Sequence, residues 1–212
     1  MKSPGETRAF LLTIDCTLMP LEQTLNNLKR ELIGTFAVVD EWFDREHPLR
    51  CHYPFPGAWN INEVLEHIML TNHYLLIIVD NARTKALRKS QSGSLPIDIP
   101  SDYSLGSKAM LQVADPDAFP WQRPDHHQPT GRVGLYEIRR EIRNQLNKCL
   151  ITLDYLPNGE GILQQTTMSV NNLGKLDVYQ YLYFLTLHAQ RHLRQMEKNK
   201  NSFMKLKEDS FV

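Results

Sequence analysis

Two histidines near the end of the chain have a spacing that suits metal chemistry. His188 and His192 lie four residues apart in the run LTLHAQRHLRQM, residues 185–196, which otherwise reads as the apolar face of a helix. Residues four apart on a helix project side by side, about 40° apart around the axis and about 6 Å apart along it. This is the ligand spacing of the HExxH zinc helix, but the catalytic Glu of that motif is missing here. The pair alone is also compatible with two hydrogen-bonded core histidines, so a metal site needs a third ligand from elsewhere.

His67 is the strongest candidate for that third ligand. It lies between Val64 and Thr71 on the margin of an apolar helical stripe, whereas His73 is expected to face outward. A histidine in this position is by itself more often a hydrogen-bonded residue at the core edge. Three neutral imidazoles with one remaining position are typical of catalytic zinc sites, and nickel or iron also fits. We therefore expect His67, His188 and His192 to bind one divalent metal ion.

Two other metal arrangements deserve comparison. Glu63 could complete a two-histidine-one-carboxylate site, but its place in a capping box with Asn60 explains it adequately. Di-iron bundles need a Glu three residues before each ligand histidine, and Val64, Leu185 and Ala189 occupy those places here. The di-iron alternative is therefore disfavoured.

Features outside the three histidines are weaker. Asp125, His126 and His127 could fold over the site, although adjacent histidines in a polar loop are usually solvated. Trp59 precedes the Asn60 cap and is expected to act as a hydrophobic staple. Cys51 lies in a linker without an identifiable base, so we do not expect a nucleophile there.

Four helical segments would position these residues, and they predict an all-α fold, a four-helix bundle. A proline after His47 is expected to end the first helix, and Asp177 with Gln180 to cap the last. We expect a single domain over residues 1–212 with its core at about 20–198, a long loop at 90–131 between helices two and three, and a charged tail at 199–212 that is loose at its end. No convincing strand pattern occurs. The helices are expected at about 18–46, 61–88, 132–156 and 177–198.

Composition excludes several classes of partner. Lys plus Arg and Asp plus Glu both total 24 over 212 residues, so no basic surplus is available to follow a nucleic-acid backbone. The longest uncharged runs are too short to span a bilayer, and we expect no secretory signal. The three cysteines form no paired motif, which favours reduced thiols and a cytoplasmic location.

Two stretches resemble a known family. The runs WNINEVLEHI, residues 59–68, and LGKLDVYQYLYFLTLHAQRHLRQM, residues 173–196, are similar to the DinB-like superfamily, which includes the YfiT-type metal hydrolases and the bacillithiol transferases. The specific features are Trp59 near the start of a helix that carries His67, and the HxxxHxxQ pattern of His188, His192 and Gln195. The resemblance implies a four-helix bundle, often a homodimer, with a divalent metal ion on these same three histidines.

The resemblance also implies an activity. Family members with a known activity act as thiol S-transferases or thiol-dependent isomerases, in which the metal activates a small-molecule thiol toward an electrophilic substrate, and other members have no assigned activity. The leading hypothesis is therefore a metal-dependent thiol S-transferase, or a hydrolase that uses water instead. The stretch at 90–131 departs from the compact family form and could reshape the substrate pocket. The rival hypothesis is a non-catalytic dimeric helical bundle in which the histidines, or a metal on them, are purely structural.

Overall fold

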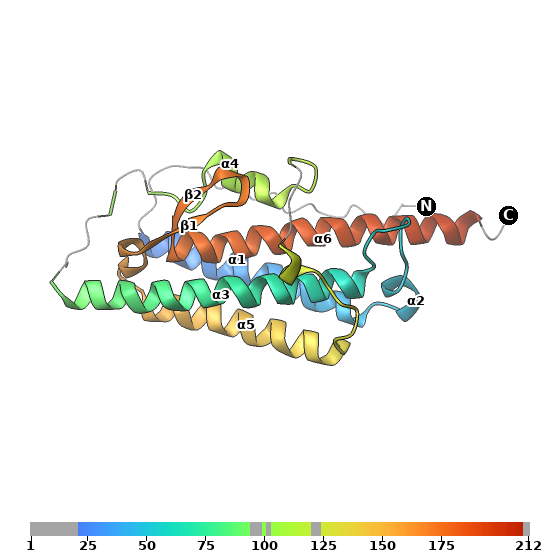
Figure 1. The fold of residues 1–212 in the computed structure, drawn as a ribbon, viewed down its shortest axis with the longest axis horizontal. Coiled ribbons are helices and arrows are strands. Elements are labelled where there is room, and N and C mark those ends of the chain that lie inside the picture. The colour runs from blue at the N-terminus through green and yellow to red at the C-terminus, as the bar shows by residue number, and fades with distance from the viewer. Residues whose placement is uncertain (1–20, 94–98, 101–102, 120–123, 210–212) are drawn as a thin grey trace, which may run out of the picture.

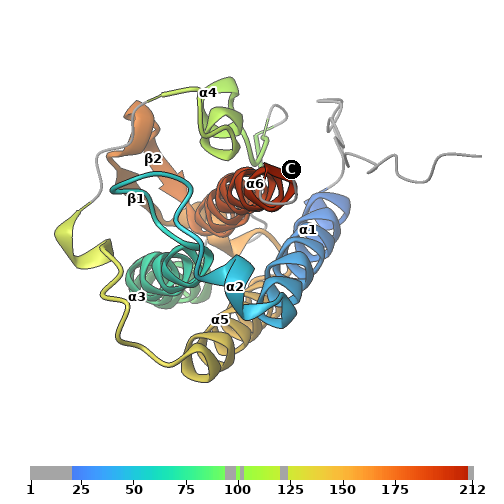
Figure 2. The same ribbon diagram turned by 90° about the vertical axis from the view of Figure 1, so that its right-hand side faces the viewer.

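The computed structural model describes residues 21–93, 99–100, 103–119 and 124–209, and its frame is a bundle of four long helices (Figure 1). Viewed end on, α1 and α3 lie at opposite corners, and each of them contacts both α5 and α6 (Figure 2). The predicted all-α four-helix bundle is confirmed. The four helices are α1 (Leu21–Glu41), α3 (Ile61–Gln91), α5 (Leu135–Tyr155) and α6 (Val178–Asp209).

The direction of the helices explains the long connection between α3 and α5. Both helices run opposite to α1 and α6, so these two neighbours are parallel and the chain must return along the bundle between them (Figure 1). A 31-residue helix such as α3 is about 47 Å long. The connection contains α4 (Lys108–Leu111) and two 3₁₀ turns, η2 (Gln112–Ala114) against α6 and η3 (Asp125–His127) against α3. The predicted loop at 90–131 is thus a crossover with short helices, and it begins after Gln91.

The two predicted helix caps are present. The Glu63 amide donates to Asn60 Oδ1 over 3.0 Å, and Glu63 Oε2 accepts from the Asn60 amide over 2.9 Å. The Asp177 and Gln180 pair makes the same reciprocal bonds, of 2.9 and 3.1 Å, at the start of α6. Because these caps define where α3 and α6 begin, they also set how far along each helix the histidines lie.

The end of the first helix differs from the prediction. α1 ends at Glu41, a 3₁₀ turn η1 (Trp42–Asp44) follows, and Pro48 lies inside a separate short helix, α2 (His47–Arg50). Proline lacks an amide hydrogen, which the first turn of a helix does not need, so it begins α2 here and does not stop α1.

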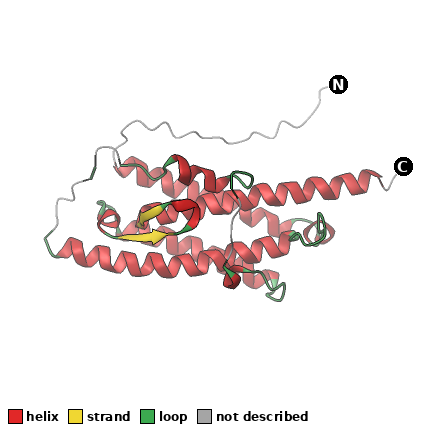
Figure 3. Ribbon diagram, turned by 45° about the horizontal axis from the view of Figure 1, so that its top comes forward, coloured by secondary structure: helices red, strands yellow, loops and turns green. Residues whose placement is uncertain are grey.

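A small antiparallel hairpin between α5 and α6 was not predicted. Strand β1 (Gln165–Met168) pairs with β2 (Gly174–Asp177) so that Gln165 is opposite Asp177 and Met168 is opposite Gly174 (Figure 3). Each strand has four residues, and neither QTTM nor GKLD alternates between apolar and polar residues, so no strand signal stands out. Two 3₁₀ turns, η4 (Glu160–Leu163) and η5 (Val170–Asn172), flank β1.

The charged C-terminal segment is helical, which corrects the prediction that the last helix ends at about residue 198. α6 continues to Asp209, and residues 210–212 lie outside the described part. Asn199 is buried and donates its side-chain amide to the Trp59 carbonyl over 2.8 Å. Ser202 Oγ lies 3.2 Å from His52 Nε2, and the rings of Phe203 and His52 are in contact. These contacts with the segment before α3 hold the last turns of α6 in place.

Within the described ranges, every helix is too short or too polar to cross a membrane.

Candidate metal centre

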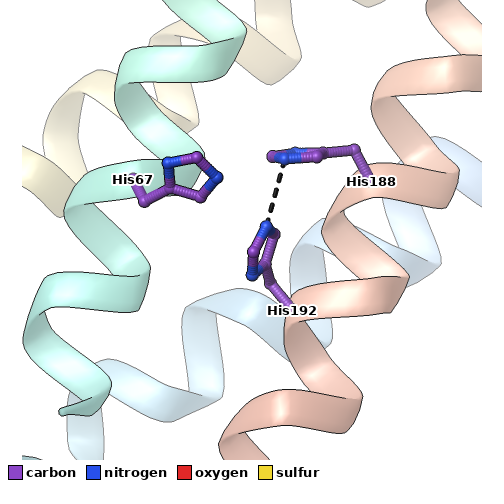
Figure 4. A group of neighbouring side chains, drawn as sticks. All are labelled: His67, His188 and His192. Carbon is purple, nitrogen blue, oxygen red and sulfur yellow. Dashed lines mark hydrogen bonds between the residues drawn. The ribbon is translucent and has the colours of Figure 1, made fainter. Parts of the chain in front are cut away.

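The three predicted histidines meet inside the bundle. Figure 4 shows His67 extending from α3 toward His188 and His192 of α6. One ligand nitrogen from each ring lies within 4.8 Å of the others, and the Nε2 atoms of His188 and His192 are 3.1 Å apart. Two nitrogens on one tetrahedral zinc ion are about 3.3 Å apart when each Zn–N bond is about 2.0 to 2.1 Å. The spacing of the pair is therefore close to what a shared ion requires.

Hydrogen bonds on the far side of two rings fix which nitrogen faces the centre. His67 Nδ1 is 2.7 Å from the His127 carbonyl oxygen, and His192 Nδ1 is 2.9 Å from Gln195 Oε1. Both partners accept, so both Nδ1 atoms carry the proton and both Nε2 atoms present a lone pair. Acceptors on the second nitrogen are a regular feature of metal-binding histidines because they orient the ring and raise its basicity.

Burial favours the neutral form of His188. The exposed fractions of His67, His188 and His192 are only 3, 2 and 6%. Burial holds the pKa of His188 well below its ordinary value, and the charges of His192 and His67 lower it further. His188 is therefore neutral at pH 7, which is the form that binds a metal ion.

A buried carboxylate anchors the crossover beside His67. Glu66 is 1% exposed and accepts three hydrogen bonds of 2.8 to 2.9 Å, two from the amide and hydroxyl of Thr130 and one from the Gly131 amide. Gly131 has φ +66°, a conformation that favours glycine, and this turn directs its amide to Glu66. Because Glu66 and His67 are adjacent, the segment 127–131 is held on α3 at the level of the metal-site candidates.

A second anchor lies beside His192. The Arg191 guanidinium donates to the backbone carbonyls of Asp115, Pro116 and Phe119. The crossover is thus attached to α6 by 115–119 and to α3 by 127–131. Both attachments are next to a histidine of the site.

His127 and Trp59 line the same region. The centroids of the Trp59 and His67 rings are 4.8 Å apart, so Trp59 contacts a residue of the site. The predicted role of Trp59 as a hydrophobic staple did not include this contact. His127 is half-buried and stacks on Tyr74 at 5.3 Å. Burial, and then the charge of His126, lowers the pKa of His127 to about 4. The adjacent His126 is exposed, so only one of the two loop histidines is solvated as predicted.

Other residues that the sequence singled out have clear outcomes. Glu63 makes the predicted cap, and His73 is exposed as expected. The view that Cys51 has no neighbouring base is wrong, because His47 Nε2 lies 3.4 Å from its sulfur across the short helix α2. The sequence also failed to identify Glu66 as an anchor. Its one available signal was an acidic residue between Leu65 and His67 in an otherwise apolar stripe.

Comparison with known proteins agrees with this geometry. A family model described as the DinB superfamily matches residues 34–196, a range that includes α3, α5 and all three histidines. Searches of curated proteins and of solved structures gave no match. The matched range is well over half of the chain, and the fold is the helical one that the family resemblance implies. The chain therefore belongs to the DinB superfamily.

Proposed function

We propose that this protein is a metal-dependent enzyme, a thiol S-transferase that uses a divalent ion on His67, His188 and His192. In the proposed reaction the sulfur of a small-molecule thiol forms a bond to an electrophilic carbon of the second substrate. The thiol loses its proton, and the carbon loses a leaving group or an epoxide C–O bond opens. The ion is zinc, nickel or iron, since three imidazoles suit each of them.

The observation that carries the proposal is the direction of the imidazole lone pairs. Nδ1 of His67 and of His192 is occupied as a donor, so both Nε2 atoms are acceptors facing the same centre. Within the trio, His188 Nε2 can donate its proton to only one of them at a time. A cation accepts lone pairs from all three rings at once, so this arrangement suits a metal better than a hydrogen-bonded core.

The chain's own residues would prepare the site for such chemistry. A bound divalent ion would supply Lewis acidity that lowers the pKa of a thiol. Trp59 and the segment 127–131 cover His67 and keep bulk water away from it. Low local polarity strengthens the interaction of an anionic sulfur with nearby donors. His188, whose pKa burial holds well below its ordinary value, adds no competing positive charge.

The choice of thiol over water rests on the DinB resemblance, and hydrolysis is the alternative outcome. Cys51 and Cys149 are both free thiols, which supports a cytoplasmic location where small thiols are also kept reduced. The resemblance further supports a homodimer, which light scattering of the purified protein would test.

Elemental analysis tests the metal site directly. Protein purified without chelator is expected to hold about one equivalent of divalent metal per chain, the stoichiometry of a three-histidine site. His188→Ala is expected to lose the metal. His73→Ala removes an exposed histidine from α3 and should retain it. Wild-type protein that takes up no zinc, nickel or iron at micromolar concentration would contradict the proposal.

A substrate screen then separates an enzyme from a metal-stabilised scaffold. Metal-loaded protein is assayed with a panel of small thiols against epoxides and alkyl halides, with His188→Ala as the blank. Thiol consumption that requires the metal supports the transferase. Ester or amide hydrolysis without thiol consumption would support the hydrolase, and no turnover with any pair would favour the non-catalytic bundle.

A further inference from the structure

The ring of His127 lies beside the three-histidine cluster without belonging to it. Its centroid is 6.5 Å from that of His67, and its charge is near enough to lower the pKa of His188. The Tyr74 ring stacks on it, with 5.3 Å between the ring centroids. The group of mutually close ligand nitrogens contains the three helix histidines and not His127. His127 is therefore too far away to be a ligand of the same ion, but it lies in the next layer around it.

Among the described residues, the buried polar atoms without a hydrogen-bond partner include two near His67, one on its crossover side and one a turn beyond it. One is His127 Nε2, and the other is the hydroxyl of Thr71, which is one turn beyond His67 on α3 and is 3% exposed. A buried polar group without a partner destabilises the fold by about 1 to 3 kcal/mol, so such atoms are rare and often mark a binding site. A molecule bound at the cluster could supply the missing partners.

The backbone around His127 is held by hydrogen bonds that do not involve its imidazole. The bonds that hold the segment on α3 use the His127 carbonyl, the Thr130 amide and hydroxyl, and the Gly131 amide. The imidazole of His127 makes none of them. The chain thus fixes the backbone at this point and leaves the buried Nε2 of the ring without a hydrogen-bond partner among the described residues.

We propose that His127 Nε2–H donates a hydrogen bond to the anionic sulfur or oxygen of the molecule that binds beside the three histidines. The inference rests on the proposed metal site and adds a substrate-binding residue from the crossover. Three protein ligands leave one tetrahedral position for a small molecule, and an atom there carries negative charge that a donor in the next layer stabilises.

Cobalt-loaded protein provides a test that does not depend on turnover. The protein is titrated with 2-mercaptoethanol, whose binding gives a sulfur-to-cobalt charge-transfer band, and separately with azide, an anion without sulfur. His127→Ala is expected to weaken binding of the thiol about tenfold, the effect of losing one hydrogen bond to a charged atom. His127→Gln keeps an N–H at a similar distance from the backbone and should restore affinity to within about threefold. His126→Ala is the matched control and should bind both probes like wild type.

The titrations with 2-mercaptoethanol and with azide, together with the cobalt content, distinguish the possible outcomes. A loss for both probes indicates a donor to any anionic atom, and a loss for the thiol alone indicates a donor selective for sulfur. Unchanged thiol affinity in His127→Ala overturns the inference while the metal site stands. Loss of cobalt itself from His127→Ala also overturns it, because His127 would then hold the ion or the fold. Wild-type protein that binds no cobalt contradicts the proposed function and this inference together.

Discussion

The two helix pairs α3–α6 and α1–α5 use their polar residues in opposite ways. Between α1 and α5 the charged groups lie at the rim, where Arg139 bridges Asp40 and Asp44, and Arg143 also pairs with Asp40. The centre of that pair is largely apolar, with residues such as Leu32 and Ile142. In the α3–α6 pair the arrangement is the opposite, because the polar groups, Glu66 and the three histidines, are buried.

This difference indicates that the two helix pairs have different roles in the bundle. Rim ion pairs are exposed to water and salt, so each contributes little and can be lost without leaving a buried charge. Buried imidazoles and carboxylates have been removed from water and must find partners in the protein or in a ligand. We infer that α1–α5 serves mainly to close the bundle, whereas α3–α6 is organised around the three-histidine cluster.

The largest expected effect is therefore a gain in the free energy of unfolding when metal is added, a gain that depends on residues of α3 and α6 and not on those of α1 and α5. Zinc at a thousand times its Kd should raise the free energy of unfolding of the wild type by about 4 kcal/mol, since it binds only the folded state. His188→Ala should show no such gain, whereas Asp40→Asn should retain it. Urea titration with zinc or with chelator measures both. An equal gain in His188→Ala would mean that zinc stabilises the protein at another place.

The sequence was sufficient for the frame of the bundle and for the three histidines because both depend on local patterns. Apolar periodicity and two capping boxes placed α3 and α6, and the four-residue spacing of His188 and His192 then required a shared face. His67 followed from its position on the apolar margin and from the family resemblance. None of these inferences needed a long-range contact.

The remaining features depend on such contacts and could not be read from the chain. Glu66 meets Thr130 across 64 residues, and the carbonyl that orients His67 belongs to a residue 60 positions away. α6 continues beyond the predicted end at residue 198, and there Asn199 donates to the Trp59 carbonyl, a residue 140 positions away. Contacts with distant residues, and not local helix propensity, determine the structure at these positions.

The next effect in size concerns the Glu66 anchor. Glu66→Gln replaces one accepting oxygen with an NH₂ group that cannot accept from a backbone amide, so at least one of three hydrogen bonds is lost. Unfolding should become easier by about 2 kcal/mol, the usual effect of losing a bond to a charged group. Amide hydrogen exchange at Thr130 and Gly131 should also become faster. Glu208→Gln, at an exposed position, is the control, and unaltered exchange in Glu66→Gln would show that the segment is held by other contacts.

A smaller effect is expected at Gly131. Its φ of +66° makes an added Cβ unfavourable by about 1 to 2 kcal/mol. Space does not decide the result, because the nearest atom to such a Cβ is Glu63 Oε1 at 3.9 Å. Gly131→Ala should therefore lower the unfolding free energy by about 1 to 2 kcal/mol, and Gly131→Asn, which tolerates this conformation better, should lower it less. Equal losses for both variants would show that backbone conformation is not the cause.

The smallest effect is expected at the rim of α1–α5, and its pH dependence identifies the cause. Hydrogen bonds from Arg139 and then Arg143 hold the pKa of Asp40 below its ordinary value of 3.8. A lowered carboxyl pKa stabilises the fold fully above that ordinary value, and the contribution is lost as the pH falls through the folded-state pKa. Asp40→Asn should thus be less stable than wild type by about 1 kcal/mol at pH 7, with a gap that narrows as the solution is acidified below about pH 4. Asp154→Asn, which removes a single exposed pair with Lys29, should change stability by less than about 0.5 kcal/mol. A gap for Asp40→Asn that stays constant down to pH 2 would mean that packing, and not charge, holds this rim together.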